Sequence, residues 1–204
     1  MPIADPILLN LPTFIETPRL ILRPPRARDG EGIYKALKDG YEGFVKWLNF
    51  PAVFPYTVEG LEKEARIHHA EWITRTYMRF LVIHKETNII IGRFGYPPFQ
   101  LNWYVPFYGI SYLLSESWQG QGYATEGINA LVRYAFEHMQ ARKVEIKCDA
   151  ENPKSIAIPE RLGFEHEATL KGYWPGKDKD KLSDVLSYCC FDMSRLPSLD
   201  IKWA

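Results

Sequence analysis

The stretch SWQGQGYATEG (Ser117–Gly127) places Gly120 and Gly122 directly before a segment with helical periodicity. The first N–H groups of a helix have no intrahelical partner, and together they carry about half a positive charge. Glycines at such a start let the backbone approach a ligand and let successive N–H groups converge. The stretch therefore predicts a cradle for a phosphate group over residues 119–124.

Three kinds of glycine turn could stand here. A P-loop requires a lysine after its second conserved glycine, and this stretch has none. A dinucleotide-binding turn requires a third glycine, where this chain has Thr125, and the strands before the turn have an antiparallel pattern. A glycine-rich helix cap without any ligand is the third alternative, because short motifs often match by chance. The two glycines alone do not decide between a phosphate cradle and a plain cap.

The composition is that of an ordinary globular protein. The chain has 204 residues, of which 46% are hydrophobic and 25% charged, and its formal net charge is zero. Without a basic field, we expect no nucleic-acid partner. Three cysteines without C-x-x-C spacing (Cys148, Cys189 and Cys190) predict buried free thiols in a reducing compartment. We see no signal peptide and no membrane-length apolar run, so we expect a cytoplasmic protein without membrane contacts.

The order of patterns predicts one mixed α/β domain rather than a repeating βαβ array. Residues 1–16, which are rich in proline, are expected to form a loosely attached arm, and residues 17–204 the domain. Alternating segments predict strands at 19–23, 79–84, 89–96, 108–114 and 143–149, followed by a strand-rich end. Helices are predicted from Asp29 to a stop at Gly40, from Thr57, from Gly122, and from Asn152 to a stop at Gly163.

Two residues of the predicted helices have both a functional and a structural interpretation. His68 lies on the apolar side of the helix that begins near Thr57, and we favour a packed, hydrogen-bonded histidine over a ligand or a base. Pro159 has no N–H and cannot bond the carbonyl of Ser155, four residues earlier. That carbonyl is therefore available to a ligand or to water, unless Pro159 is only a tolerated kink.

Longer segments around the glycine turn carry a family pattern. The segments GISYLLSESWQGQGYATEGINALVRYAF and VEIKCDAENPKSIAIPERLGF resemble the GCN5-related N-acetyltransferase (GNAT) superfamily, in particular its RimJ/RimL-type ribosomal-protein N-terminal acetyltransferases. The opening TPRLILRPPRARDGEGIYKAL and the late SDVLSYCCFDM fit the same group, so the resemblance spans 17–193. It implies a GNAT fold, whose central, twisted and mostly antiparallel sheet splays at the cofactor site and is flanked by helices.

The resemblance also implies acetyl-CoA as cofactor and assigns residues to it. Backbone N–H groups of the glycine turn would bind the pyrophosphate, the strand 112–114 would pair with the pantetheine arm, and Asn152 and Ser155 would lie near the arm and the sulfur. The expected cofactor-binding residues are Leu113, Leu114, Gln119, Gly120, Gln121, Gly122, Tyr123, Ala124, Thr125, Asn152, Ser155 and Arg161. No metal is expected.

Acetyl transfer to an amine needs a neutral amine, a donor for the oxyanion, and stabilisation of the leaving thiolate. The resemblance suggests a backbone N–H near Tyr112 for the oxyanion and the hydroxyl of Ser155 for the sulfur. Some relatives have a glutamate about ten residues beyond the Gly-Phe pair, but this chain has LKGYWPG there, without a carboxylate. Glu126, Glu116 and Asp184 are candidate bases, although Glu126 also suits the first turn of a helix and Asp184 suits pairing with a lysine.

Aromatic residues Trp47, Trp103 and Tyr104, from EGFVKWLNF and QLNWYVPFYG, are candidates for the acceptor pocket, with core or loop packing as the alternative. The leading hypothesis is an acetyl-CoA-dependent N-acetyltransferase that acts on the α-amine of a protein or peptide. The alternatives are an acetyltransferase for small amines, such as antibiotics, polyamines or amino acids, and a non-catalytic CoA-binding module. A homodimer stays open, since the sequence does not give the oligomeric state.

Overall fold

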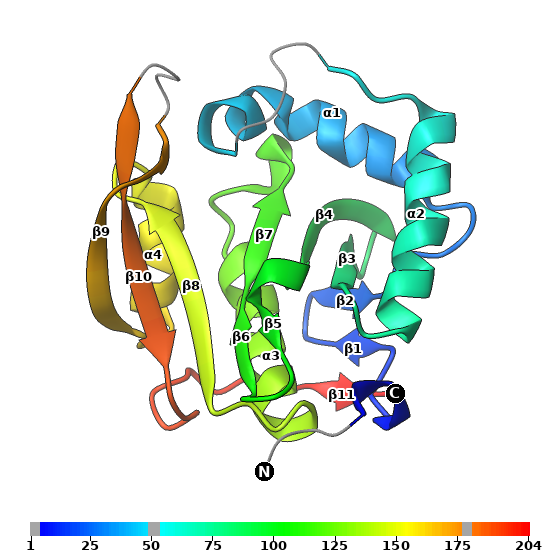
Figure 1. The fold of residues 1–204 in the computed structure, drawn as a ribbon. Helices are drawn as coiled ribbons and strands as arrows, with labels where there is room; N and C mark the ends of the chain where they lie inside the picture. Colours follow the sequence, from blue (N-terminus) through cyan, green and yellow to red (C-terminus); the bar gives the residue numbers. More distant parts are fainter. Residues whose placement is uncertain (1–4, 49–53, 177–180) are drawn as a thin grey trace.

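The fold consists of two sheets with helices packed on them (Figure 1). It was analysed in a computed structural model, which describes residues 5–48, 54–176 and 181–204. Residues 1–4 of the expected arm, and Asn49 and Phe50 of the expected acceptor pocket, lie outside the described residues. The mixed α/β class and the mostly antiparallel pairing confirm the predicted fold class.

The first sheet is formed by strands from the first 114 residues and by one strand near the C-terminal end, in the order β11-β1-β2-β3-β4-β7. All its described pairings are antiparallel. The strands are β1 (Ile15–Glu16), β2 (Leu20–Arg23), β3 (Met78–His84), β4 (Ile89–Tyr96), β7 (Ser111–Leu114) and β11 (Lys202–Trp203). The alternating segments therefore form strands where they were predicted.

The second sheet has the strand order β5-β6-β8-β10-β9. Strand β6 runs parallel to β8, and the other described pairs are antiparallel. The strands are β5 (Leu101–Asn102), β6 (Phe107–Gly109), β8 (Lys143–Asp149), β9 (Glu165–Pro175) and β10 (Leu182–Cys190).

One stretch of chain connects the two sheets. The predicted strand 108–114 is divided at Ile110: its first part, β6, pairs with β8, and its second part, β7, pairs with β4. Strands β7 and β8 diverge from this point (Figure 1). The predicted splay of the sheet is thus present, directly before the glycine turn.

Helix α1 (Gly30–Trp47) is longer than predicted, and the expected stop at Gly40 is wrong. Its apolar side continues past the glycine to Phe44, which is buried with Ile33 and Leu37 against the sheet. A side chain at position 40 would collide with the Phe44 ring, so this glycine permits packing rather than ending the helix. Tertiary packing here overrides the weak local preference of glycine.

The other helices begin and end near the predicted residues. Thr57 caps α2 by accepting a hydrogen bond from the N–H of Gly60, and Asn152 caps α4 by accepting one from Ser155. The helices are α2 (Val58–Ile73), α3 (Tyr123–His138) and α4 (Pro153–Arg161), with the short 3₁₀ turns η1 (Pro6–Leu8), η2 (Pro98–Gln100) and η3 (Glu116–Trp118). In the part of the chain that the structure describes, no helix combines the length and apolar composition that a bilayer crossing requires.

The described part of the N-terminal arm is joined to the first sheet rather than loosely attached. Ile15 is fully buried in β1, which pairs with β2 and with β11 from the opposite end of the chain. Tyr134 of α3 donates a hydrogen bond to the carbonyl of Pro12. These contacts explain why the segment is ordered although it is rich in proline.

The first sheet has different helices on its two faces. A large apolar cluster that includes Ile128 and Leu131 of α3 covers one face, and a smaller one with Leu37 of α1 and Leu61 of α2 covers the other. Tyr112 packs against the first cluster and Leu113 against the second, as alternation along a strand requires. The sheet thus separates an α3 face from an α1–α2 face.

His68 belongs to a charged network between α2 and strands β3 and β4. Its ring nitrogens lie 2.6 Å from a Glu71 oxygen and 3.0 Å from Glu64 Oε1. Glu64 also accepts hydrogen bonds from Arg79 at 2.7 Å and from Arg93 at 2.6 Å. The packed, hydrogen-bonded histidine that the sequence favours is confirmed.

We predict that Glu64→Gln lowers the free energy of unfolding at neutral pH, because it leaves buried Arg93 without a counter-charge. The expected loss is about 1–3 kcal/mol, between the values for exposed and for buried ion pairs. Burial opposes ionisation of Glu64, but the hydrogen bond from His68 and the charges of Arg93 and Arg79 lower its pKa to about 2. This folded-state pKa lies below the unfolded value, so the contribution is complete above about pH 4.5 and disappears as the pH falls toward 2.

Urea denaturation between pH 2 and pH 7 measures this effect. The matched control is Glu31→Gln, which removes an exposed i,i+4 pair with Lys35 and should change stability by less than about 0.5 kcal/mol. A difference between Glu64→Gln and wild type that stays constant down to pH 2 would contradict the assignment.

Candidate active site

Both glycines of the turn before α3 have a left-handed backbone conformation. Gly120 and Gly122 have φ of +76° and +83°, a region that side chains rarely occupy. Gly122 is the N-cap of α3, and within the described part of the chain no side chain caps the helix at this end. The first N–H groups of α3 are therefore available to an anion, while the presence of the anion itself stays a prediction.

Strand β7 presents backbone groups to the gap between the sheets. The N–H of Ile110 donates to Glu145 of β8, and the N–H of Ser115 donates to Ile91 of β4, each at 2.9 Å. Since backbone groups alternate between the two edges of a strand, those of Tyr112 and Leu114 face the β8 side. Among the described strands, β7 is the last of its sheet, so this edge can accept an extended ligand.

Gln119 connects the open edge with the turn. Its side-chain amide donates to the carbonyl of Leu114 at 3.0 Å, and its amide oxygen accepts from Lys154 of α4 at 3.2 Å. The end of β7, the glycine turn and the start of α4 are thus held together. By the alternation described above, the backbone groups of Leu113 face β4, so that residue contributes less to the open edge than its neighbours do.

A cluster of hydroxyl and thiol groups lies beside this edge. The phenol oxygen of Tyr112 is 2.7 Å from Ser155 Oγ, and Ser155 Oγ is 3.3 Å from the sulfur of Cys148 on β8. Burial raises the pKa of Tyr112 well above its ordinary value and also raises that of Cys148. Both groups are therefore protonated at neutral pH and can supply hydrogen bonds.

Pro159 leaves the carbonyl of Ser155 without a hydrogen bond inside α4, but a side chain of strand β7 binds this carbonyl. The phenol of Tyr112 lies 3.2 Å from the carbonyl oxygen of Ser155, within hydrogen-bonding distance. The sequence left open whether this carbonyl is available to a ligand or water or whether Pro159 is only a tolerated kink, and in the structure a side chain of β7 lies against the carbonyl. The missing hydrogen bond of α4 thus helps to fix Tyr112 against Ser155.

The three candidate bases have no described hydrogen bond to the Tyr112–Ser155 cluster. Glu126 accepts hydrogen bonds from Thr17 and Arg19, and its side chain is only 8% exposed. Asp184 accepts from Lys171 at 2.6 Å and from the N–H of Gly172, and the Lys171 contact lowers its pKa. Glu116 is exposed in η3. These contacts favour the structural alternatives for Glu126 and Asp184.

The aromatic candidates for the acceptor pocket lie in different places. Trp47, half-buried, ends α1, with the Lys46 ammonium 4.7 Å from its ring centre. Trp103 donates to the carbonyl of Arg75 and packs on Tyr108, while Tyr104 is 76% exposed. Residues 103–104 precede β6 and lie at the end of the β6–β7 stretch remote from the glycine turn.

The remaining expected cofactor residues lie at the start of α3 and at the end of α4. Tyr123, Ala124 and Thr125 form the first turn of α3, and exposed Arg161 is the last residue of α4.

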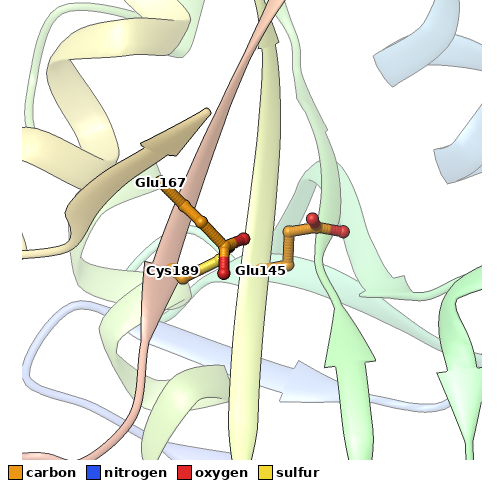
Figure 2. A group of neighbouring side chains, drawn as sticks. All are labelled: Glu145, Glu167 and Cys189. Atoms are coloured by element: carbon orange, nitrogen blue, oxygen red, sulfur yellow. Dashed lines mark hydrogen bonds between the residues drawn. The ribbon is translucent and has the colours of Figure 1, made fainter. Parts of the chain in front are cut away.

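A second group of titratable side chains lies on the second sheet: Glu145 of β8, Cys189 of β10 and Glu167 of β9 (Figure 2). Lys143 donates to both oxygens of Glu167 at 2.7 Å, and Lys147 lies 3.2 Å from Glu145. Burial and the Glu167 contact raise the pKa of Cys189 to about 12. Because two ammonium groups already balance the carboxylates and the thiol stays protonated, we assign no metal to this group.

Comparison with known proteins identifies the family. The model of the acetyltransferase (GNAT) domain family matches residues 19–165. The chain belongs to this family. Its members are acetyltransferases that use acetyl-CoA, which confirms the predicted enzyme class and agrees with the predicted cofactor.

Individual relatives support the RimJ/RimL resemblance. An uncharacterized N-acetyltransferase, p20, from Bacillus licheniformis is 33% identical over 111 residues, which are 54% of this chain and 60% of that protein. The ribosomal-protein-serine acetyltransferase of Escherichia coli K12 is 39% identical over 62 residues, or 30% of this chain and 35% of the relative. The structure of Mycobacterium smegmatis RimJ in complex with CoA-disulfide shares the fold, with a TM-score of 0.76 and 20% identity over 91% of this chain and 89% of that one.

The family's cofactor fits the features of this site. The uncapped start of α3 behind left-handed glycines suits a diphosphate, and the open edge of β7 suits an extended amide-containing arm. Sequence reasoning missed the phenol of Tyr112, the sulfur of Cys148 and the side chain of Arg19 as neighbours of these features. Arg19 lies in the segment TPRLILR, which was quoted for the family resemblance, and this was the one sequence feature that could have drawn attention to it.

Taking Ser155 as the predicted acid at the leaving sulfur, we predict that Ser155→Ala lowers kcat about 100-fold, the low end of the range for general acid catalysis, with little change in the KM for acetyl-CoA. Tyr112→Phe keeps the ring packed near Phe94 but removes both contacts with Ser155, so a smaller loss in kcat is expected. Thiol release from acetyl-CoA measures both effects.

Tyr108→Phe is the matched control. Tyr108 lies on the same stretch of chain, and its buried phenol donates to the carbonyl of Met139 instead. This variant should lose stability but retain kcat. Equal kcat losses in Tyr108→Phe and Tyr112→Phe would argue against a specific role of Tyr112.

Proposed function

We propose that this protein transfers the acetyl group of acetyl-CoA to the α-amine at the N-terminus of a protein or peptide, by direct attack while both substrates are bound. The observation that carries the proposal is the juxtaposition of an open strand edge, an uncapped helix start and the Tyr112–Ser155 pair. The local similarity to a ribosomal-protein-serine acetyltransferase supports a protein acceptor.

The contacts of the carboxylates favour an α-amine. Glu126 and Asp184 already have cationic partners, and neither has a described contact with Tyr112 or Ser155. An α-amine with a pKa of ~7.8 is about one-tenth neutral at pH 7, whereas a lysine amine with a pKa of ~10.4 is neutral in well under a thousandth of molecules. A site without a dedicated strong base therefore suits the α-amine.

Each part of the site has a distinct task in this proposal. The N–H groups of the first turn of α3 bind the diphosphate of acetyl-CoA, and the edge of β7 orients its arm. An N–H that faces the gap, from Tyr112 or Leu114, stabilises the developing negative charge on the carbonyl oxygen. Ser155 donates its hydroxyl proton to the leaving sulfur and takes one from the phenol of Tyr112, which is 2.7 Å away. Solvent accepts the proton that the attacking amine loses and returns one to Tyr112, so the relay ends in its starting state.

The two faces of the sheet separate the substrates. Ser155 and the phenol of Tyr112 lie on the face that α3 and α4 cover, so we place the thioester sulfur there. The amine then approaches from the α1–α2 side, where Trp47 ends α1. Of the three aromatic candidates, Trp47 is therefore the one that we retain for acceptor binding.

A panel of acceptors tests the proposal. Peptides with a free N-terminus should be acetylated, whereas N-terminally blocked peptides that contain lysine should react at least about a hundredfold more slowly at pH 7, because of their smaller neutral fraction. The rate with a free N-terminus should rise with pH, reach half of its maximum near pH ~7.8 and level off above about pH 9, as the α-amine loses its proton.

The panel also separates the alternatives. Fast acetylation of polyamines or aminoglycoside-like amines without reaction at N-termini would support a small-molecule enzyme instead. Binding of acetyl-CoA without turnover on any amine would support a non-catalytic module. Mass spectrometry of the peptide products locates the acetyl group on the α- or the ε-nitrogen.

A further inference from the structure

Arg19, directly before strand β2, connects the N-terminal segment to the glycine turn. Its Nη1 donates to the carbonyl of Gln121 at 2.9 Å, and its guanidinium carbon lies 4.5 Å from the ring centre of Tyr123. Its Nε donates to Glu126 Oε2 at 2.6 Å. One side chain thus contacts the turn and the first residues of α3.

Glu126 is held from a second direction. Its Oε1 accepts from the hydroxyl of Thr17 at 2.7 Å and from the backbone N–H of Arg19 at 3.0 Å. We call Thr17, Arg19, Gln121 and Glu126 the clasp. Because both carboxylate oxygens have donors and the side chain is 8% exposed, Glu126 is a fixed point to which Arg19 is attached.

The clasp acts on the most flexible part of the site. Glycine has more backbone freedom than any other residue, and Gln121 stands between two glycines with positive φ. The carbonyl of Gln121 and the N–H of Gly122 belong to one planar trans peptide, in which they point in opposite directions. When Arg19 binds the carbonyl, the N–H of Gly122 is turned away from Arg19.

We propose that Arg19 is a positioning residue for the cofactor: it orients the Gln121–Gly122 peptide so that its N–H faces the diphosphate of acetyl-CoA. The charge of Arg19 is already paired with Glu126 at 2.6 Å, which indicates that it acts through geometry rather than as a free cation. The inference rests on the cofactor placement given under the proposed function, and it does not depend on the acceptor.

Binding measurements without any acceptor test this role. Calorimetry with CoA, and competition with pantetheine, which lacks the diphosphate and the nucleotide, compare wild type with Arg19→Ala. We expect the Kd for CoA to rise about tenfold and the Kd for pantetheine to stay the same. Arg26→Ala is the matched control, because Arg26 is an exposed arginine of the same N-terminal region.

Two further variants separate geometry from charge and from folding. Arg19→Lys keeps the charge but replaces the two guanidinium nitrogens that contact Glu126 and Gln121 with one ammonium nitrogen on a flexible stem, so we expect it to bind CoA nearly as weakly as Arg19→Ala. Glu126→Gln keeps acceptors for Thr17 and the backbone but weakens the hold on Arg19, so an intermediate Kd is expected. Melting temperatures identify variants that fail to fold, and Arg19→Lys is then the deciding variant.

Several results would overturn the inference. These are an unchanged Kd for CoA in Arg19→Ala, equal losses for CoA and pantetheine, or full recovery of CoA binding in Arg19→Lys. Each of them leaves the acceptor proposal intact, whereas a wild-type protein that binds CoA but acetylates no N-terminus contradicts only that proposal.

Discussion

The site depends on one constraint: a single stretch of chain pairs with two different sheets. Residues 107–109 pair with β8 and residues 111–114 pair with β4, so none of the described strands pairs with the second part on its β8 side. Unpaired edges usually invite association with other strands. Here the edge lies inside the molecule, between the diverging strands β7 and β8, where a bound arm can complete its hydrogen bonds (Figure 1).

The functional groups of this site are mainly backbone groups, and side chains fix them in place. Gln119 holds the end of β7, Asn152 caps α4, and the Ser155 carbonyl, released by Pro159, is bound by Tyr112. None of these contacts requires an unusual residue on its own. Together they set the spacing between the strand edge, the helix start and the hydroxyl of Ser155, and that spacing decides what can react there.

Features encoded in short segments could be predicted from the sequence. The helix that starts behind the two glycines, the Asn152 cap and the Gly163 stop each depend on a few neighbouring residues, and the structure has all three. Interactions between distant segments could not be predicted. Gly40 continues α1 because the Phe44 ring packs over it, and Glu126 meets Arg19 across 107 residues of sequence. The indole N–H of Trp103 donates a hydrogen bond to the carbonyl of Arg75, a contact that the residues around Trp103 do not predict.

Glu126 follows the glycine turn closely in sequence and therefore resembles a catalytic base, although its contacts do not support that role. An acid in the first turn of α3 stabilises the helix dipole, but an unpaired carboxylate there would repel the diphosphate that the same helix start attracts. The ion pair with Arg19 removes this conflict, since it neutralises the carboxylate and uses it as an anchor for the turn. In the proposed site, the residue that resembles a base in the sequence therefore holds the turn that binds the cofactor. Solvent can then take the proton of the α-ammonium group, because an amine with a pKa of ~7.8 is weakly basic and about one-tenth neutral at pH 7.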